Sequence, residues 1–533
     1  MKRTGNRIAL GLDFGTESVR AVLVTLCGCE VGDAVAGYRH GQITRELVGT
    51  GELLPSDFAL QHPNDWIESS SRAVKRAVRA AAVDAADIVG IGVDFTSCTM
   101  LPCQADGTPL CLTERFAERL HAWPKLWKHH GAQSQTDRIN QVARTGREQW
   151  LKRYGGVVGL EWFFPKVLEV IEKAPAVYDA TDIWLEGGDW YVWQLVGAEE
   201  LTRSTCQAGY KGLWSEEDGF PSPRFFRKLN PRMEHVVRDK MPGVLRAPGE
   251  SAGELCPAMA RRMGLSPGIP VSTAVIDAHA GVPGAGVSQM NTLVMVLGTS
   301  SCHMLMHREA CDVPGVAGIV RGGILPGSYG YETGQAAVGD AFAWLMQMVG
   351  HRDFRRLDEE AGQLPPGSDG VMCIDWFNGC RTPLMDGRLA GAFTGLTLNH
   401  GSAHLYRALL EATGLGLRWI VDVLETGGVP VKRLVATGGL PHHNPLLMQI
   451  YADVLGQSIS IPPSERGSAV GAAVLGALAA GKRATGFAST TAAVRSMAAV
   501  ELPRIVRPHR GRHKVYDRLY QRYRDLTSHI ANG

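Results

Sequence analysis

The chain has 533 residues, of which 45% are hydrophobic and 20% are charged. This length exceeds what one hydrophobic core normally organises, so we expect two or three domains. The net charge is only +2, which argues against a protein that binds nucleic acid or a membrane surface. A short basic run at 507–514 is typical of a solvated surface, because no recognised nucleic-acid motif accompanies it.

The cysteines and apolar runs indicate the compartment. Eleven cysteines are scattered without paired spacing and without histidines at zinc-site spacing. This usage, together with the lack of a signal-peptide pattern, predicts a protein of the reducing cytoplasm. No apolar run reaches the roughly 18 residues that a bilayer-spanning helix needs, so we expect no membrane partner.

The first strong element is an apolar strand, a polar turn and a second apolar strand over residues 7–26. Asp13 ends the first strand, and Gly15, Thr16 and Ser18 in the turn offer N–H and hydroxyl donors that suit phosphate oxygens. The turn lacks the Walker pattern, so it is not a P-loop. Alone it is a weak signal, because acidic and hydroxyl residues are common in hairpin turns.

The next segments predict a mixture of helices and strands. Residues 64–82 have the apolar spacing of an amphipathic helix, and residues 87–110 predict a buried strand, a polar loop and a hairpin. The segment 120–133 is rich in Trp, Lys and His; such aromatics often line sugar sites, although Trp is as often a core anchor. Further on, Lys211 stands between glycine and aromatic residues, which suggests a fixed position.

The segment 271–286 predicts a buried strand followed by a helix, with Asp277 between them. A carboxylate at a helix N-terminus lies where the helix dipole favours the ionised form. Such a group could take a proton from a substrate hydroxyl. The alternative is a helix-capping aspartate with no chemistry.

A second strand, turn and strand begins near residue 293, with Gly298, Thr299 and Ser300 at its turn. It lies about half the chain beyond the first such turn, which indicates an internal duplication at the scale of a domain. A segment mixing Pro, Gly and charge at 246–268 is the predicted boundary. The two turns could hold opposite ends of a triphosphate across a cleft; the alternative is two unrelated hairpins with similar turn chemistry.

The remaining candidates lie in the second half. Glu332 precedes a glycine and a predicted helix, where a helix N-terminal carboxylate without function is the alternative. A predicted strand ends at Gly438 and Gly439, and a helix follows with Asn444 near its start. A double glycine lets a flat ring approach the backbone, which suits an adenine. The Ala/Gly-rich helix predicted at 465–481 could pack close behind it.

With these motifs laid out, the chain resembles the FGGY carbohydrate kinases nearly end to end, and within them the kinases of L-ribulose. The most specific pieces are LEWFFPKVLEV (160–170), GGDWYVWQLVG (187–197), CQAGYKGLW (206–214) and IDWFNGCRTP (374–383). The resemblance implies two α/β domains of the ribonuclease-H-like type, found in the actin, sugar kinase and chaperone ATPase superfamily, with a cleft between them. We place the sugar-binding domain at 1–256 and the nucleotide-binding domain at 257–533.

The resemblance also implies the site. Asp277 matches the family's catalytic base, and Asp13 matches the residue that orients Mg²⁺ through water. The other matching positions form three groups: phosphate-holding Thr16, Glu17, Ser18, Gly298, Thr299 and Ser300; adenosine-pocket Gly438, Gly439 and Asn444; and sugar-binding Ser97, Cys98, Trp127, Lys211 and Glu332. The implied reaction transfers a phosphoryl group from ATP to the C5 hydroxyl of L-ribulose, as in L-arabinose catabolism, and relatives suggest a homodimer.

Two positions depart from the family pattern. His129 stands where we expect Asp, close to the expected sugar site, and His443 stands where we expect Lys, beside the adenine. Three alternatives stay open: a related kinase for D-ribulose, xylulose or ribitol, a non-catalytic sugar-sensing protein, and an ATP-driven chaperone-like switch. Intact Asp13 and Asp277 argue against the second, and the length leaves no room for the substrate-binding domain of the third.

Overall fold

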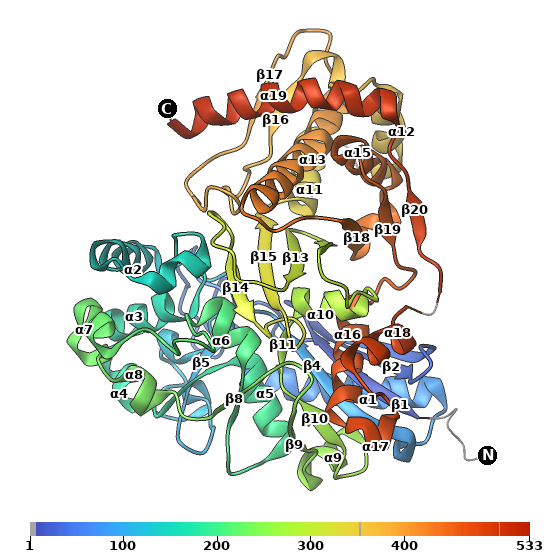
Figure 1. Ribbon diagram of the computed structural model, residues 1–533. Helices are drawn as coiled ribbons and strands as arrows, with labels where there is room; N and C mark the ends of the chain where they lie inside the picture. The colour runs from blue at the N-terminus through green and yellow to red at the C-terminus, as the bar shows by residue number, and fades with distance from the viewer. Residues whose placement is uncertain (1–6, 351–352, 500, 533) are drawn as a thin grey trace.

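The computed structural model describes residues 7–350, 353–499 and 501–532. The chain forms two lobes, each built on its own β-sheet (Figure 1). The lower lobe in this view holds mainly the first half of the chain, and the upper lobe holds most of the second half. Of the helices in the described ranges, none combines the length and apolarity that crossing a bilayer requires.

The first sheet has seven strands, in the order β3-β2-β1-β4-β10-β9, with β11 also paired to β4. These strands are β1 (Ile8–Phe14), β2 (Ser18–Thr25), β3 (Glu30–Gly37), β4 (Ile88–Phe95), β9 (Ser251–Glu254), β10 (Pro270–Ser272) and β11 (Val275–Ile276). β1 is antiparallel to β2 and parallel to β4. Both β1 and β4 are almost continuously apolar, because helices cover the sheet.

The second sheet repeats this arrangement, in the order β14-β15-β13-β12-β18-β19-β20. Its strands are β12 (Thr292–Leu297), β13 (Ser301–His307), β14 (Gly318–Arg321), β15 (Tyr329–Gln335), β18 (Arg433–Thr437), β19 (Ile459–Ile461) and β20 (Arg504–Val506). β12 is antiparallel to β13 and parallel to β18, as β1 is to β2 and β4. The two-domain α/β fold is therefore confirmed, with the same hairpin and parallel strand in each lobe.

Helices surround both sheets. Those of the lower lobe are α1 (Pro63–Ala81), α2 (Gln133–Gly146), α3 (Phe163–Lys173), α4 (Pro175–Ala180), α5 (Gly187–Val196), α6 (Thr205–Lys211), α7 (Pro223–Leu229), α8 (Val236–Lys240), α9 (Pro257–Met263) and α10 (Asp277–Gly284). Those of the upper lobe are α11 (Gly339–Met348), α12 (Phe354–Gln363), α13 (Ser402–Thr426), α14 (Gly439–His443), α15 (Pro445–Leu455) and α19 (Arg510–Asn532). Short strand pairs complete the lobes: β5 (Met100–Cys103) with β6 (Ile183–Glu186), β7 (Thr202–Ser204) with β8 (Val244–Arg246), and β16 (Met372–Ile374) with β17 (Ala392–Thr394).

Late in the chain, α16 (Gly467–Ala479), α17 (Gly481–Thr485) and α18 (Thr490–Met497) return to the lower lobe (Figure 1). The body of α16 packs against β1, β4 and α10, not behind the double glycine as we expected. The approach is so close that a Cβ at Gly92 would lie 1.7 Å from the Ala472 carbonyl oxygen. The first residue of α16, Gly467, lies beside Thr437, which directly precedes the double glycine, and Val470 of α16 lines a cavity together with Gly439.

The boundary between the lobes lies later than residue 256. β9 and β10 pair with each other in the first sheet, so a division at 256/257 would separate two hydrogen-bonded strands. β11 also pairs with β4, and α10 packs on α16 of the same lobe. We therefore place the boundary between α10 and β12.

Candidate active site

A cavity of about 820 Å³ collects side chains from both lobes. Among the residues predicted for the site, those that line it are Thr16, Ser97, Trp127, Lys211, Asp277, Thr299, Ser300 and Glu332. They belong to segments that are far apart in the chain, including both polar turns, the end of α6, the start of α10 and β15. This cavity is the candidate active site.

The two polar turns lie on this cavity from opposite lobes. The turn between β1 and β2 is closed by a hydrogen bond from the Gly15 N–H to the Ser18 carbonyl (3.0 Å). The turn between β12 and β13 is closed by Gly298 N–H and the Ser300 carbonyl (3.0 Å). Thr16, Thr299 and Ser300 reach the cavity, whereas the residues described as lining it do not include Glu17, Ser18 or Gly298. The predicted pairing of the turns across one cleft agrees with this placement.

Asp277 is the first residue of α10, directly after β11, and it lines the cavity. Its Oδ1 accepts a hydrogen bond from the Ala278 N–H (2.7 Å). Burial raises the pKa of Asp277 to about 7, and the nearby charges of Asp13 and Glu332 add to the effect. The Ala278 N–H at the helix N-terminus favours the ionised form, as we expected, but burial outweighs it and the net pKa is raised. A carboxylate with this pKa suits general-base chemistry near neutral pH.

Lys211 and Glu332 form a buried ion pair in the cavity wall. Lys211 ends α6, and its Nζ donates to Glu332 Oε1 at 2.6 Å. Glu332 lies in the middle of β15, so it is not the helix N-terminal carboxylate that we considered as the alternative. Burial opposes ionisation of both groups, but each partner outweighs it, so the pKa of Lys211 is raised and that of Glu332 is lowered. Both therefore stay charged and can hydrogen-bond to sugar hydroxyls.

A second pair of acidic residues lies at the ends of β1 and β4. Asp13 and Asp94 are adjacent in the parallel register of these strands. Asp94 is fully buried, and among the described residues neither of its carboxylate oxygens has a hydrogen-bond partner. Burial raises the pKa of Asp13, and burial with the charge of Asp13 raises that of Asp94 well above its usual value. Paired carboxylates with free oxygens fit a divalent cation, which prefers oxygen ligands. We did not single out Asp94 from the sequence.

Of the residues predicted to bind the sugar, most line the cavity, but one lies in the hydrophobic core. The Trp127 indole N–H donates to Thr16 Oγ1 (3.2 Å), which fixes the ring against the first turn. Ser97 lines the cavity, whereas Cys98 is only 2% exposed and is not among its described lining residues. Cys98 has a φ of 56°, so the backbone turns sharply there and directs the thiol into the core. Burial raises the pKa of this thiol to about 12.

The two departures from the family pattern lie away from the cavity. His129 is buried, and its Nε2 lies 2.8 Å from Glu169 Oε2, which Lys125 Nζ also approaches at 3.2 Å. His129 is not among the described residues that line the first cavity, whereas its neighbours Trp127 and His130 are, so its closeness to the sugar stays a prediction. His443 is exposed, and its Nε2 lies 3.8 Å from Glu465 Oε2.

A second cavity, of about 840 Å³, has Gly439 in its wall together with Arg20 and Arg466. Gly438 has a φ of 96°, and a Cβ there would lie 2.5 Å from the Leu297 carbonyl oxygen, so only glycine fits this turn. Asn444 is buried and caps α15: its Oδ1 accepts from the Leu447 N–H at 2.8 Å. The Asn444 amide also donates to Asp358 and Tyr406, and Asn444 is not among the described residues that line this cavity.

Sequence reasoning missed several residues of the first cavity. Arg381 comes from the loop IDWFNGCRTP and lies 3.9 Å from Glu161 across the lobes. His279 lies two residues after Asp277, buried beside Glu332. The sequence marked both segments, but it could not show which of their side chains face the cavity.

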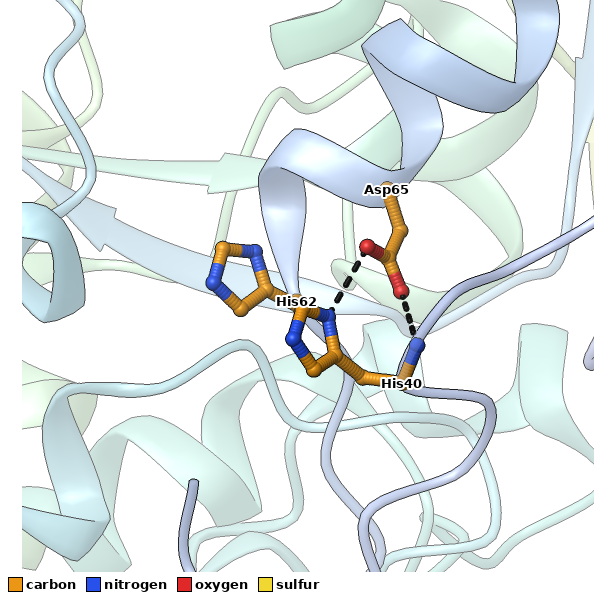
Figure 2. Close-up of side chains that lie close together, drawn as sticks. All are labelled: His40, His62 and Asp65. Atoms are coloured by element: carbon orange, nitrogen blue, oxygen red, sulfur yellow. Dashed lines mark hydrogen bonds and ion pairs between the residues drawn. The ribbon is translucent and has the colours of Figure 1, made fainter. Parts of the chain in front are cut away.

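One further group of potential metal ligands lies outside both cavities (Figure 2). Asp65 accepts hydrogen bonds from the His40 ring (2.9 Å) and from the His40 backbone N–H (2.8 Å). His62 caps α1 by accepting from the Asn64 N–H (3.2 Å). The His40 and His62 rings stack at 4.4 Å with 15° between their planes. A metal ion binds an imidazole nitrogen in the ring plane, and near-parallel planes share no such position, so this group serves to join the segment after β3 to the start of α1.

Comparisons with known proteins agree with this architecture. Residues 8–284 match the N-terminal domain of the FGGY family of carbohydrate kinases, and residues 293–480 match its C-terminal domain. The chain is 43% identical to a ribulokinase of Geobacillus thermodenitrificans, over 99% of this chain and 95% of that protein. It is 44% identical to a ribulokinase of Mycolicibacterium smegmatis, over 89% and 86% of the two chains.

Solved structures share the fold at lower identity. A xylulose kinase from Rhodospirillum rubrum superimposes with a TM-score of 0.79 at 24% identity, over 99% of both chains. Plasmodium falciparum glycerol kinase with ADP gives 0.78 at 15% identity, over 98% of both chains.

Proposed function

The chain belongs to the FGGY family of carbohydrate kinases, and on that premise we propose that it transfers the γ-phosphoryl group of ATP to the C5 hydroxyl of L-ribulose. The observation that carries the proposal is the meeting of Asp277, the Lys211–Glu332 pair and both polar turns on one cavity. The name of relatives that are 43% identical over nearly the whole chain supports ribulose as the sugar.

Asp277 accepts the proton of the C5 hydroxyl while that oxygen attacks the γ-phosphorus. Its pKa of about 7 lets it hold this proton without trapping it. Lys211 and Glu332 bind the other hydroxyls and so orient the sugar, and Trp127 closes the pocket beside Thr16. Phosphoryl transfer asks little covalent chemistry of a protein, so orientation and charge stabilisation supply most of the catalysis.

Kinases of this family use ATP as co-substrate, typically with a divalent metal ion. We propose that the ion is Mg²⁺ and that Asp13, with Asp94 beside it, holds the ion's water shell. When bound, Mg²⁺ neutralises charge on the transferred phosphoryl group. The two turns, at Thr16 to Ser18 and at Gly298 to Ser300, would supply N–H and hydroxyl donors to the phosphates, and the adenosine would lie along Gly438 and Gly439.

The context of the reaction follows from the same resemblance. We propose that the product, L-ribulose 5-phosphate, serves L-arabinose catabolism in the cytoplasm, and that the enzyme is a homodimer. Sedimentation of the purified protein would test the assembly.

The test of the activity is ADP release with Mg-ATP across L-ribulose, D-ribulose, L-xylulose, D-xylulose, ribitol and glycerol. We expect kcat/KM for L-ribulose to exceed the others at least about tenfold. Preference for another of these compounds would keep a carbohydrate kinase and replace the substrate. A folded protein that binds ATP but turns over none of them would overturn the proposal in favour of a sugar-sensing role.

A further inference from the structure

His279 is a cavity residue to which the proposed mechanism gives no task. It lies on α10, two residues after Asp277, and is only 1% exposed. It is among the residues that line the first cavity. The Tyr210 ring packs against the imidazole with 4.1 Å between centroids, which limits rotation of the His279 side chain.

Polar atoms of His279 and of the neighbouring Glu332 lack hydrogen-bond partners among the described residues. Within the described residues, neither of its ring nitrogens has a hydrogen-bond partner. The same is true of Glu332 Oε2, whereas Glu332 Oε1 is taken by Lys211. Buried polar atoms without partners are costly, and these three belong to residues that line one cavity, which indicates a ligand that pairs with some of them.

The spacing shows what would fit. His279 Nε2 and Glu332 Oε2 are 3.6 Å apart, which is too long for a direct hydrogen bond. One hydroxyl oxygen placed about 2.8 Å from both atoms would satisfy each of them, since a hydroxyl accepts one hydrogen bond and donates another. A carbohydrate supplies such hydroxyls.

We propose that one hydroxyl of the ketose bridges His279 Nε2 and Glu332 Oε2, accepting a hydrogen bond from the imidazole and donating one to the carboxylate. The inference rests on the proposed function, in which Asp277 takes the C5 hydroxyl, so the bridging group is a different hydroxyl. His279 is then a sugar-binding residue that reads the position of this hydroxyl in the substrate.

The charges agree with these roles. Burial lowers the pKa of His279 to about 4, so near pH 7 the ring is neutral and carries one N–H. Lys211 outweighs the burial of Glu332 and keeps the carboxylate ionised. The negative charge of Glu332 favours the proton on Nε2, the ring nitrogen that faces it.

Three variants test the proposal. His279→Gln keeps an N–H near the position of Nε2, whereas His279→Leu removes it. The shorter side chain of His279→Asn places its amide too far from Glu332 for both to bind one hydroxyl. We expect the Leu and Asn variants to raise KM for L-ribulose about tenfold or more, with KM for ATP within twofold of the unmodified enzyme. The Gln variant should stay within about threefold for both substrates. The Asn variant keeps the test available if Leu prevents folding.

Deoxy-ketoses locate the bridging hydroxyl. Removing it from the sugar should weaken binding to the unmodified enzyme about tenfold and to the Asn variant little, because the bridge is already lost there. Folded Leu or Asn variants with unchanged KM for L-ribulose would overturn the inference. It would also be overturned if removal of each hydroxyl weakened binding to the unmodified enzyme and to the Asn variant by the same factor. An unmodified enzyme that does not phosphorylate L-ribulose would instead overturn the proposed function.

Discussion

Lys211 Nζ lies 2.6 Å from Glu332 Oε1, and this ion pair joins α6 of the lower lobe to β15 of the upper lobe. Both side chains are less than 10% exposed. The pair is therefore part of the sugar pocket and also a contact between the lobes. Because a buried charge is stabilised by its partner, removal of either residue leaves the other as an unpaired charge that destabilises the fold.

We expect Lys211→Met and Glu332→Gln each to lower the free energy of unfolding by about 3 kcal/mol or more, since each leaves an uncompensated buried group. The double variant should regain a large part of this loss but bind the sugar poorly. Chemical denaturation of the four proteins in a double-mutant cycle measures the coupling. Additive losses would show that the pair is not coupled.

Asp277→Asn should reduce kcat by about two to four orders of magnitude, because the amide cannot accept the hydroxyl proton. Sugar binding should persist, and isothermal titration calorimetry can follow it. The matched control is Asp106→Asn, on an exposed hairpin turn, which should leave kcat unchanged. Near-normal turnover of the Asp277 variant would remove this residue from the catalytic role.

The rate should depend on pH through Asp277. Only its ionised form accepts a proton, and burial raises its pKa to about 7. We expect kcat/KM for the ketose to fall about tenfold per pH unit below pH 7 and to level off above it. The pKa of Glu332 is lowered, so this carboxylate stays ionised over this range and adds no second break to the pH–rate profile. A profile that is level down to pH 5 would contradict the assignment.

Asp13→Asn should raise the Mg²⁺ concentration for half-maximal rate about tenfold or more, as removal of a residue that orients a metal's water shell does. The ketose KM should change little. Asp106→Asn again serves as control, because within the described ranges its carboxylate accepts a hydrogen bond only from Thr108 of the same turn. Titration of initial rates with MgCl₂ at fixed ATP gives the comparison, and identical curves for all three proteins would place the metal elsewhere.

Gly92→Ala should lower the free energy of unfolding by about 3 kcal/mol, because the added methyl meets the α16 backbone at 1.7 Å. Gly37→Ala is the matched control: apart from its chain neighbours, no atom of the described residues lies within 4 Å of the added Cβ, and we expect a change of about 0.5 kcal/mol or less. Thermal unfolding of both variants measures the difference. Equal melting temperatures would mean that α16 can move away from β4.

The sequence by itself determined the local elements. Neighbouring residues predict the apolar strands, the polar turns and the change from strand to helix at Asp277. Hydrophobic periodicity and turn propensity act over a few positions of the chain. The resemblance to the FGGY kinases then placed the two turns, Lys211 and Glu332 on one site, and the structure brings them to one cavity.

Tertiary structure alone decided the environment of these groups. Burial raises the pKa of Asp277 against the effect of the helix N-terminus, and the backbone turn at Cys98 places its thiol in the core. Asp94 meets Asp13 only through the register of β1 and β4. His279 meets Glu332 only when the two lobes come together. Such contacts join residues that are far apart in the chain, and short-range patterns carry no information about the distance between them.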